Sequence, residues 1–132
     1  MSIDTLSPLE LASPTVVSRA AHDFAAVLAA TGPFMALEAA SDRLRQDRAA
    51  QHAMQAYQAK QQSLQAVLML NALSTDEQTE LEHLREAFLA EPAVTAYLQA
   101  EADLRTMCQA AADRLSEHVG LNFASACNAG CC

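Results

Sequence analysis

The stretch EPAVTAYLQAEADLRTMCQAAADRLSEHVG, residues 91–120, decides the fold class. Its proline suits the first turn of a helix, where the missing N–H costs nothing, and its final glycine is a candidate C-cap. The side chains between them that keep heptad spacing are Val94, Tyr97, Glu101, Leu104, Cys108, Ala111, Leu115 and His118. We therefore expect one long helix from Pro92 to Val119 with a narrow apolar stripe.

The composition extends this expectation to the whole chain of 132 residues. Aromatic residues make up 5%, there are 3 glycines and 4 prolines, and the β-branched runs typical of strands are missing. Alanine, leucine, glutamine and glutamate, which are abundant, favour helices. The sequence predicts an all-α protein with a flexible N-terminal arm (1–14), a helical domain (15–120) and a cysteine-containing C-terminal tail (121–132).

Capping residues, glycine and proline mark the other helix boundaries. The expected segments run from Ser13 or Thr15 to about 30, from near Phe34 to 46, from Asp47 to about Asn71, and over 75–90. Asp47 is predicted either to cap the third segment or to kink it. Ser74 or Thr75 precedes Glu77 and Gln78 at the spacing of a capping box.

A weak internal repeat relates DRAAQHAMQAYQA, residues 47–59, to EPAVTAYLQAEAD, residues 91–103. Each copy starts with an acidic residue and follows an amphipathic segment. The simplest architecture is an antiparallel hairpin of two long helices, each preceded by a shorter one. A narrow stripe buries little area in one hairpin, so we expect a homo-oligomer or an assembly with a paralogous chain.

Charge and targeting signals narrow the function. The net charge of −8 argues against direct binding of nucleic acid, because a phosphate backbone requires a basic surface. The N-terminal segment MSIDTLSPLE has no apolar core of a signal peptide, and no stretch reaches the roughly 18 apolar residues of a membrane span. These features predict a cytoplasmic protein, a compartment in which thiols stay reduced.

The sequence contains no motif of the common enzyme classes, such as a glycine-rich phosphate loop, a nucleophile elbow or HExxH. We therefore do not expect an enzyme. His22, His52 and His83 are scattered along helices and are expected to be structural. Cys108 falls on the stripe and is expected to be a small buried apolar residue, with a ligand role as the lesser alternative.

The last residues, NFASACNAGCC, hold Cys127, Cys131 and Cys132 in the pattern C-x3-C-C. Thiolates bind zinc, copper(I) or iron–sulfur clusters. The adjacent pair makes closure around one zinc ion awkward, whereas an iron–sulfur cluster is wider and neighbouring cysteines can reach different irons. We interpret the tail as a metal or cluster site, completed by Cys108, His118 or another chain. A zinc site and a dispensable free tail are the alternatives; lipid attachment lacks polybasic support.

The segment LSTDEQTELEHLREAFLAEPAVTAYLQAEADLRTMCQAAADRLSEHVGLNF, residues 73–123, resembles the YlbF/YmcA family of small helical bacterial proteins. The shared features are a helix start at Thr75 to Glu77, the Glu91-Pro92 step, the pattern V..Y..A...L over Val94, Tyr97, Ala100 and Leu104, and a closing segment from Gly120 to Phe123. The likeness runs from about Thr15 to Phe123.

This resemblance implies a helical regulator without catalytic activity that associates with related proteins. It also implies a role in competence, sporulation or biofilm development, as an accessory factor of ribonuclease Y. Complexes of the family carry iron–sulfur clusters through cysteines. By resemblance, Cys127, Cys131 and Cys132 are expected to bind such a cluster, of the four-iron, four-sulfur type.

Overall fold

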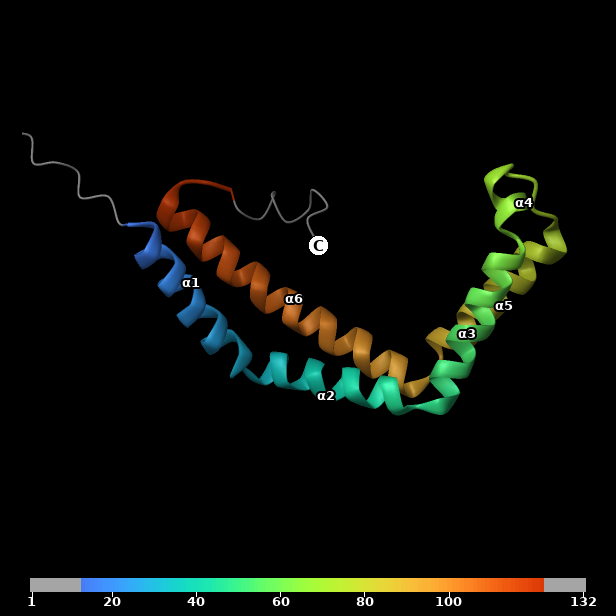
Figure 1. Cartoon of the computed structure of the whole chain (residues 1–132), viewed down its shortest axis with the longest axis horizontal. Helices are drawn as coiled ribbons and strands as arrows, with labels where there is room; N and C mark the ends of the chain where they lie inside the picture. The colour runs from blue at the N-terminus through green and yellow to red at the C-terminus, as the bar shows by residue number, and fades with distance from the viewer. Residues whose placement is uncertain (1–12, 123–132) are drawn as a thin grey trace, which may run out of the picture. The chain divides into compact units, whose positions relative to one another are not determined.

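The computed structural model describes residues 13–122, and every element in this range is an α-helix, which confirms the all-α class. The helices are α1 (Pro14–Ala29), α2 (Gly32–Gln46), α3 (Arg48–Ser63), α4 (Gln65–Met69), α5 (Thr75–Leu89) and α6 (Pro92–Val119) (Figure 1). The chain divides into two compact units, Met1–Thr31 and Gly32–Cys132. The described part of the first unit is α1 and its caps.

Helix α1 has a well-defined start and end. The Ser13 side chain accepts a hydrogen bond from the Val16 N–H, and Pro14 occupies the first turn. After Ala29, the Thr31 hydroxyl donates to the Leu28 carbonyl at 2.6 Å. No residue of α1 is buried, and Val16, Val17, Phe24 and Val27 are all more than half exposed.

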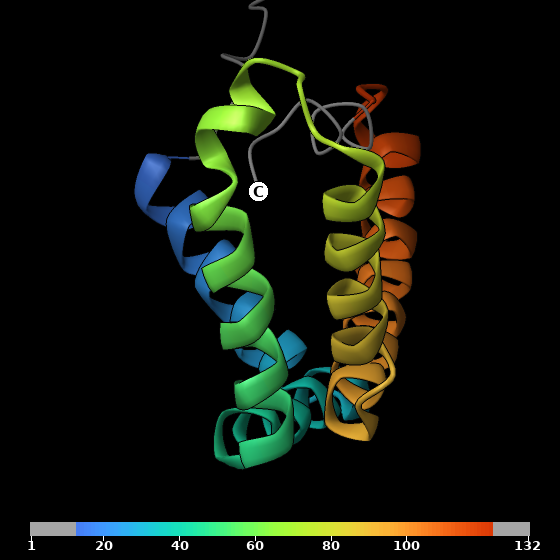
Figure 2. The same cartoon turned by 90° about the vertical axis from the view of Figure 1, so that its right-hand side faces the viewer.

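The second unit is built from two antiparallel helix pairs. α2 packs along α6, and α3 packs along α5, so each long helix lies against the shorter helix of the other repeat copy. Figure 1 shows α2 and α6 running in opposite directions, and Figure 2 shows the same relation for α3 and α5. The antiparallel packing expected from the sequence is present, but it pairs each long helix with a shorter one, and the two arms of the hairpin are α2–α3 and α5–α6. The two long helices are not each other's main partners.

Both arms break at equivalent positions of the internal repeat. Asp47 directly precedes α3 as the predicted N-cap, and its carboxylate accepts from the Ala50 N–H at 2.8 Å. Glu91 is the N-cap residue of α6 but makes no such side-chain bond, and Pro92 is the first residue of the helix. A side chain of the following helix also bonds the end of the preceding helix across each break. The Gln51 amide donates to the Leu44 carbonyl at 2.9 Å, and the Thr95 hydroxyl donates to the Leu89 carbonyl at 3.2 Å.

The core lies where the two breaks meet. Ala50, Ala93 and Val94 form its buried cluster, and Leu44 and Phe88 pack on it while partly exposed. Two of the three central residues are alanines, which allow the helix backbones to approach closely. Within residues 13–122 no large side chain is fully buried, so the core of this unit is small.

The end of α3 differs from the sequence expectation of one helix to about Asn71. α3 stops at Ser63, and a short α4 follows after Leu64. The Ser63 hydroxyl donates to the Lys60 carbonyl at 2.8 Å, a local bond of the kind that competes with helix continuation. Leu64 is buried at the break, which holds the chain there. The helix ends here without the glycine or proline that usually marks a helix end in a sequence. The buried Leu64 side chain and the Ser63 hydroxyl bond are found at the break instead.

The remaining boundaries agree with the prediction. The Ser74 side chain accepts from the Glu77 N–H at 3.2 Å and caps α5. Gly120 ends α6 with φ of 74°, in the left-handed region, and its N–H bonds the Ser116 carbonyl at 2.8 Å. Over residues 13–122 no single helix is long and apolar enough to cross a membrane. Only α1 and α2 taken together, across the break between them, meet that test by length and composition.

Candidate functional site

The predicted ligand residues fall into two groups. Cys127, Cys131 and Cys132 lie outside the described residues, so their predicted joint role stays a prediction. Cys108 and His118 lie on α6, within the described range. In residues 13–122 no group of three or more histidine, cysteine or acidic side chains is placed to hold a metal ion. A site at the end of this chain would therefore rest on the tail thiols.

Cys108 is exposed, which corrects the expectation that it is a buried core residue. The reason is the length of its neighbour. Leu44 of α2 packs on the cluster that contains Val94 of α6. Because the two helices are antiparallel and have the same rise per residue, Gly32, which begins α2 twelve residues before Leu44, lies level with about residue 106 of α6. Cys108 lies beyond that level, where α2 no longer covers the stripe.

His118 is also exposed, in the last turn of α6. It is ten residues after Cys108, a separation of about 15 Å along a helix axis. Metal–ligand bonds are only about 2.0–2.3 Å long. The two side chains of one α6 are therefore too far apart to bind the same metal ion. His118 is the nearer to the tail in sequence.

The uncovered part of α6 carries apolar side chains. Leu115 is 51% exposed and Val119 is 56% exposed. Leu115 belongs to the stripe whose first half, around Val94, is buried against α2, and Val119 lies one turn further along, beside it. The stripe expected to drive oligomerisation is thus divided: its start belongs to the core of the chain, and its C-terminal part faces outward from the second unit.

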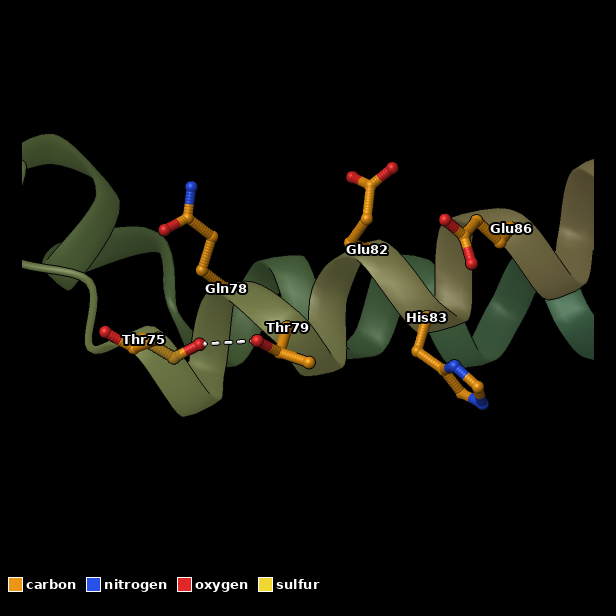
Figure 3. A pocket seen from close by; sticks show the side chains of 6 residues that line it. All are labelled: Thr75, Gln78, Thr79, Glu82, His83 and Glu86. Carbon is orange, nitrogen blue, oxygen red and sulfur yellow. Dashed lines mark hydrogen bonds between the residues drawn. The ribbon is translucent and has the colours of Figure 1, made fainter.

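Figure 3 shows a shallow depression on α5, lined by Thr75, Gln78, Thr79, Glu82, His83 and Glu86. All six residues come from one helix. The His83 ring points away from Gln78 and Glu82, and the Thr79 hydroxyl donates to the Thr75 carbonyl at 2.9 Å. Glu82 accepts from Arg85 at 3.3 Å. These side chains do not converge on a common point, and the His83 side chain is exposed.

A groove of about 400 Å³ lies between α2 and α6. Its lining is partly apolar, from Phe34, Leu37 and Tyr97, each half-buried. The rest of the lining comes from α2, as Ser41 and the exposed charged residues Glu38, Asp42 and Arg45. Sequence reasoning singled out Tyr97 as a stripe residue and missed the others, because the groove exists only once α2 is laid against α6.

Ion pairs in the described range are mostly local. Asp42 with Arg45, Glu82 with Arg85, and Glu101 with Arg105 are each within one helix. Lys60 and Glu80, at 2.8 Å, join α3 to α5. Exposed pairs of this kind contribute less than about 1 kcal/mol, so they orient the helices more than they stabilise them.

Comparison with known proteins identifies the helical part. A model of the family described as "Control of competence regulator ComK, YlbF/YmcA" matches residues 17–119, most of the chain. The chain belongs to the YlbF/YmcA family. No curated protein and no solved structure matches it significantly. The YlbF/YmcA match covers α2 to α6 and nearly all of α1, and it ends before the three tail cysteines.

Membership in the YlbF/YmcA family places the chain among regulators of competence. The motif residues of the sequence analysis have different tasks in the fold. Val94 and Ala100 are buried, whereas Tyr97 lines the groove between α2 and α6. The YlbF/YmcA pattern thus combines positions that hold the helices together with one that reaches a surface site.

Proposed function

We propose that this chain is a regulatory adaptor subunit without catalytic activity, which acts by assembling with a second copy or with paralogous members of the YlbF/YmcA family. The observation that carries this proposal is the apolar C-terminal part of α6, at Leu115 and Val119, which α2 is too short to cover. Burial of such side chains stabilises an interface by roughly 25 cal/mol per Å² before association costs. The cell compartment is the cytoplasm.

Sedimentation equilibrium of the full chain tests the assembly. Leu115→Lys with Val119→Lys should lower the association constant at least about tenfold, because two charges would enter an apolar contact. Ala102→Lys with Gln109→Lys adds the same charge at exposed positions of the same helix and is the matched control. A chain that stays monomeric at high concentration would exclude homo-assembly. The same measurement with a purified paralogue then decides whether hetero-assembly remains.

We further propose that Cys127, Cys131 and Cys132 bind an iron–sulfur cluster, of the four-iron, four-sulfur type. The support is the chemistry of the donor set, since thiolates are the ligands of such clusters. His118, Cys108 or a residue of a partner chain would supply the remaining ligand. The residues between the cysteines, Asn128, Ala129 and Gly130, offer backbone N–H groups as potential hydrogen-bond donors to cluster sulfurs.

Anaerobic reconstitution with iron and sulfide tests the cluster. The wild-type chain should gain visible charge-transfer absorption, and replacement of all three tail cysteines by serine should remove it. Helicity by circular dichroism should not change in that variant, because α1 to α6 end before the tail. Full cluster content in the triple variant would refute the tail as the site. Uptake of zinc alone would favour the alternative function, a structural helical adaptor with a zinc-binding or dispensable tail.

We propose that the assembled chain regulates RNA processing by ribonuclease Y, and through it cell development. The acidic balance of the chain supports an indirect route, through protein contact and not through RNA. Titration of labelled chain with purified ribonuclease Y, alone and with the paralogue present, tests this route. Lack of binding in both conditions would remove ribonuclease Y as the partner while leaving the assembly proposal intact.

A further inference from the structure

The groove between α2 and α6 combines aromatic and acidic groups. Phe34 and Tyr97 bring ring surfaces from the two helices, and Leu37 adds an aliphatic contact. Glu38 and Asp42 stand one turn apart on α2 beside them. Apolar ring faces beside carboxylates match a group that is flat, weakly hydrated and cationic, which describes the guanidinium of arginine.

The charges of the groove leave one carboxylate unpaired. Arg45 donates to Asp42, which satisfies that carboxylate within the helix. Glu38 is exposed and has no ion-pair partner within residues 13–122. The three charged groups carry a net charge of −1, and the chain as a whole carries −8. The groove thus lacks one cation to balance Glu38.

The internal repeat supplies a natural comparison on α5. Gln78, Glu82 and Glu86 stand at the positions that match Phe34, Glu38 and Asp42. Glu82 and Glu86 keep the two carboxylates. The two aromatic side chains are absent, because Gln78 stands in place of Phe34 and Ala53 in place of Tyr97. Glu82 is already paired with Arg85. Only the groove on α2 has both the aromatic side chains and the unpaired carboxylate. This combination is therefore specific to the groove and is not a feature that both copies of the repeat share.

We propose that this groove binds an arginine side chain presented by a partner protein, with Glu38 as the carboxylate that receives the guanidinium and Tyr97 and Phe34 as the surfaces on which it stacks. The proposal rests on the proposed function, since it names the chemistry of the partner that the adaptor recognises. The partner's arginine is flanked by an apolar residue that contacts Leu37. A lysine binds more weakly, because an ammonium cannot stack and bind a carboxylate in one plane.

NMR of the ¹⁵N-labelled full chain tests this with a defined probe, acetyl-Leu-Arg-Leu-amide. Its neutral counterpart carries citrulline in place of arginine and keeps the shape. The arginine peptide should give saturable shifts confined to amides of 34–45 and 94–101, and the citrulline peptide should bind at least about tenfold more weakly, as expected for the loss of a charge-assisted contact. Equal binding of both peptides, or shifts spread over α5, would overturn the proposal.

Variants assign the contacts. Glu38→Gln should weaken binding about tenfold, whereas Glu82→Gln, at the repeat-equivalent position, should leave it unchanged. Tyr97→Phe keeps the ring and should keep binding, and Tyr97→Leu should lose most of it. Phe34→Leu gives a second test of stacking if Tyr97→Leu does not fold. Unchanged affinity in Glu38→Gln would refute the assignment. Sedimentation of Glu38→Gln separates the two proposals: normal assembly without peptide binding would leave the adaptor function standing and remove the arginine site.

Discussion

Ala50 and Val94 occupy equivalent positions in the two copies of the internal repeat, and they pack in the same buried cluster, 0% and 2% exposed. Leu44 and Phe88, which pack on that cluster, are equivalent to each other in the same way. The second unit therefore has approximate two-fold symmetry, in which α2–α3 and α5–α6 exchange places. The stability of this unit depends on the point where the two copies meet.

Substitution of Ala50 tests how tightly that point is packed. Ala50→Leu should lower the free energy of unfolding by about 1–3 kcal/mol, because three added carbons find no space between the helix starts. Ala49→Leu adds the same atoms at an exposed neighbouring position and should change stability by less than about 0.5 kcal/mol. Urea denaturation measures both. Equal effects at the two positions would show that the cluster is loosely packed.

The two helix breaks predict unequal responses to alanine. Asp47→Ala removes the carboxylate that accepts from the Ala50 N–H and should cost about 1 kcal/mol. Glu91→Ala, at the equivalent position, removes no side-chain cap bond and should cost clearly less. Chemical denaturation of the two variants in parallel is the check. A larger loss at Glu91 than at Asp47 would contradict the capping assignment.

Substitution of Gly120 and Gly32 by alanine tests whether backbone conformation, and not steric space, makes a glycine necessary. Among residues 13–122, a Cβ at either glycine would meet no atom within 4 Å beyond its own chain neighbours and local helix backbone. Gly120 has φ of 74°, so Gly120→Ala should destabilise the end of α6 by about 1 kcal/mol. Gly32→Ala should be neutral or slightly stabilising, because alanine restricts the unfolded chain. Thermal unfolding followed by circular dichroism ranks the two, and a reversed order would refute the left-handed cap as the cause.

The isolated chain should bind RNA weakly or not at all. Its net charge of −8 repels the phosphate backbone, and no basic surface with interleaved aromatic residues is present in its sequence. Fluorescence polarisation with a labelled single-stranded RNA at low salt is the most permissive assay. Tight binding that weakens steeply with added salt would contradict this expectation and the indirect route to RNA processing.

Local chemistry made most of the fold predictable. The helix starts at Asp47 and Ser74 and the end at Gly120 depend on side-chain hydrogen bonds or backbone conformations that single residues specify. The break at Leu64 was missed because it depends on burial by tertiary neighbours. Exposure of Cys108 was missed for a related reason: heptad spacing shows which face is apolar but not how far a neighbouring helix extends along it.

The candidate sites divide in the same way. A cysteine cluster in a tail is visible in sequence, because donor type and spacing alone suggest metal binding. The groove at Tyr97 and Glu38 is not, because its two sides come from helices far apart in the chain. Heptad spacing places Tyr97 on the apolar stripe of α6, but it does not show that residues of α2 lie beside it.

Because α2 packs on α6 and α3 packs on α5, the two arms of the second unit hold each other without the loop that connects them. Each copy offers its short helix to the long helix of the other, and the α4 region is the only covalent link between them within residues 32–119. A chain opened between α4 and α5 keeps every helix pair, so its halves should find each other in solution. Two copies of a single arm could therefore form the same pattern of helix pairs, each copy covering the long helix of the other.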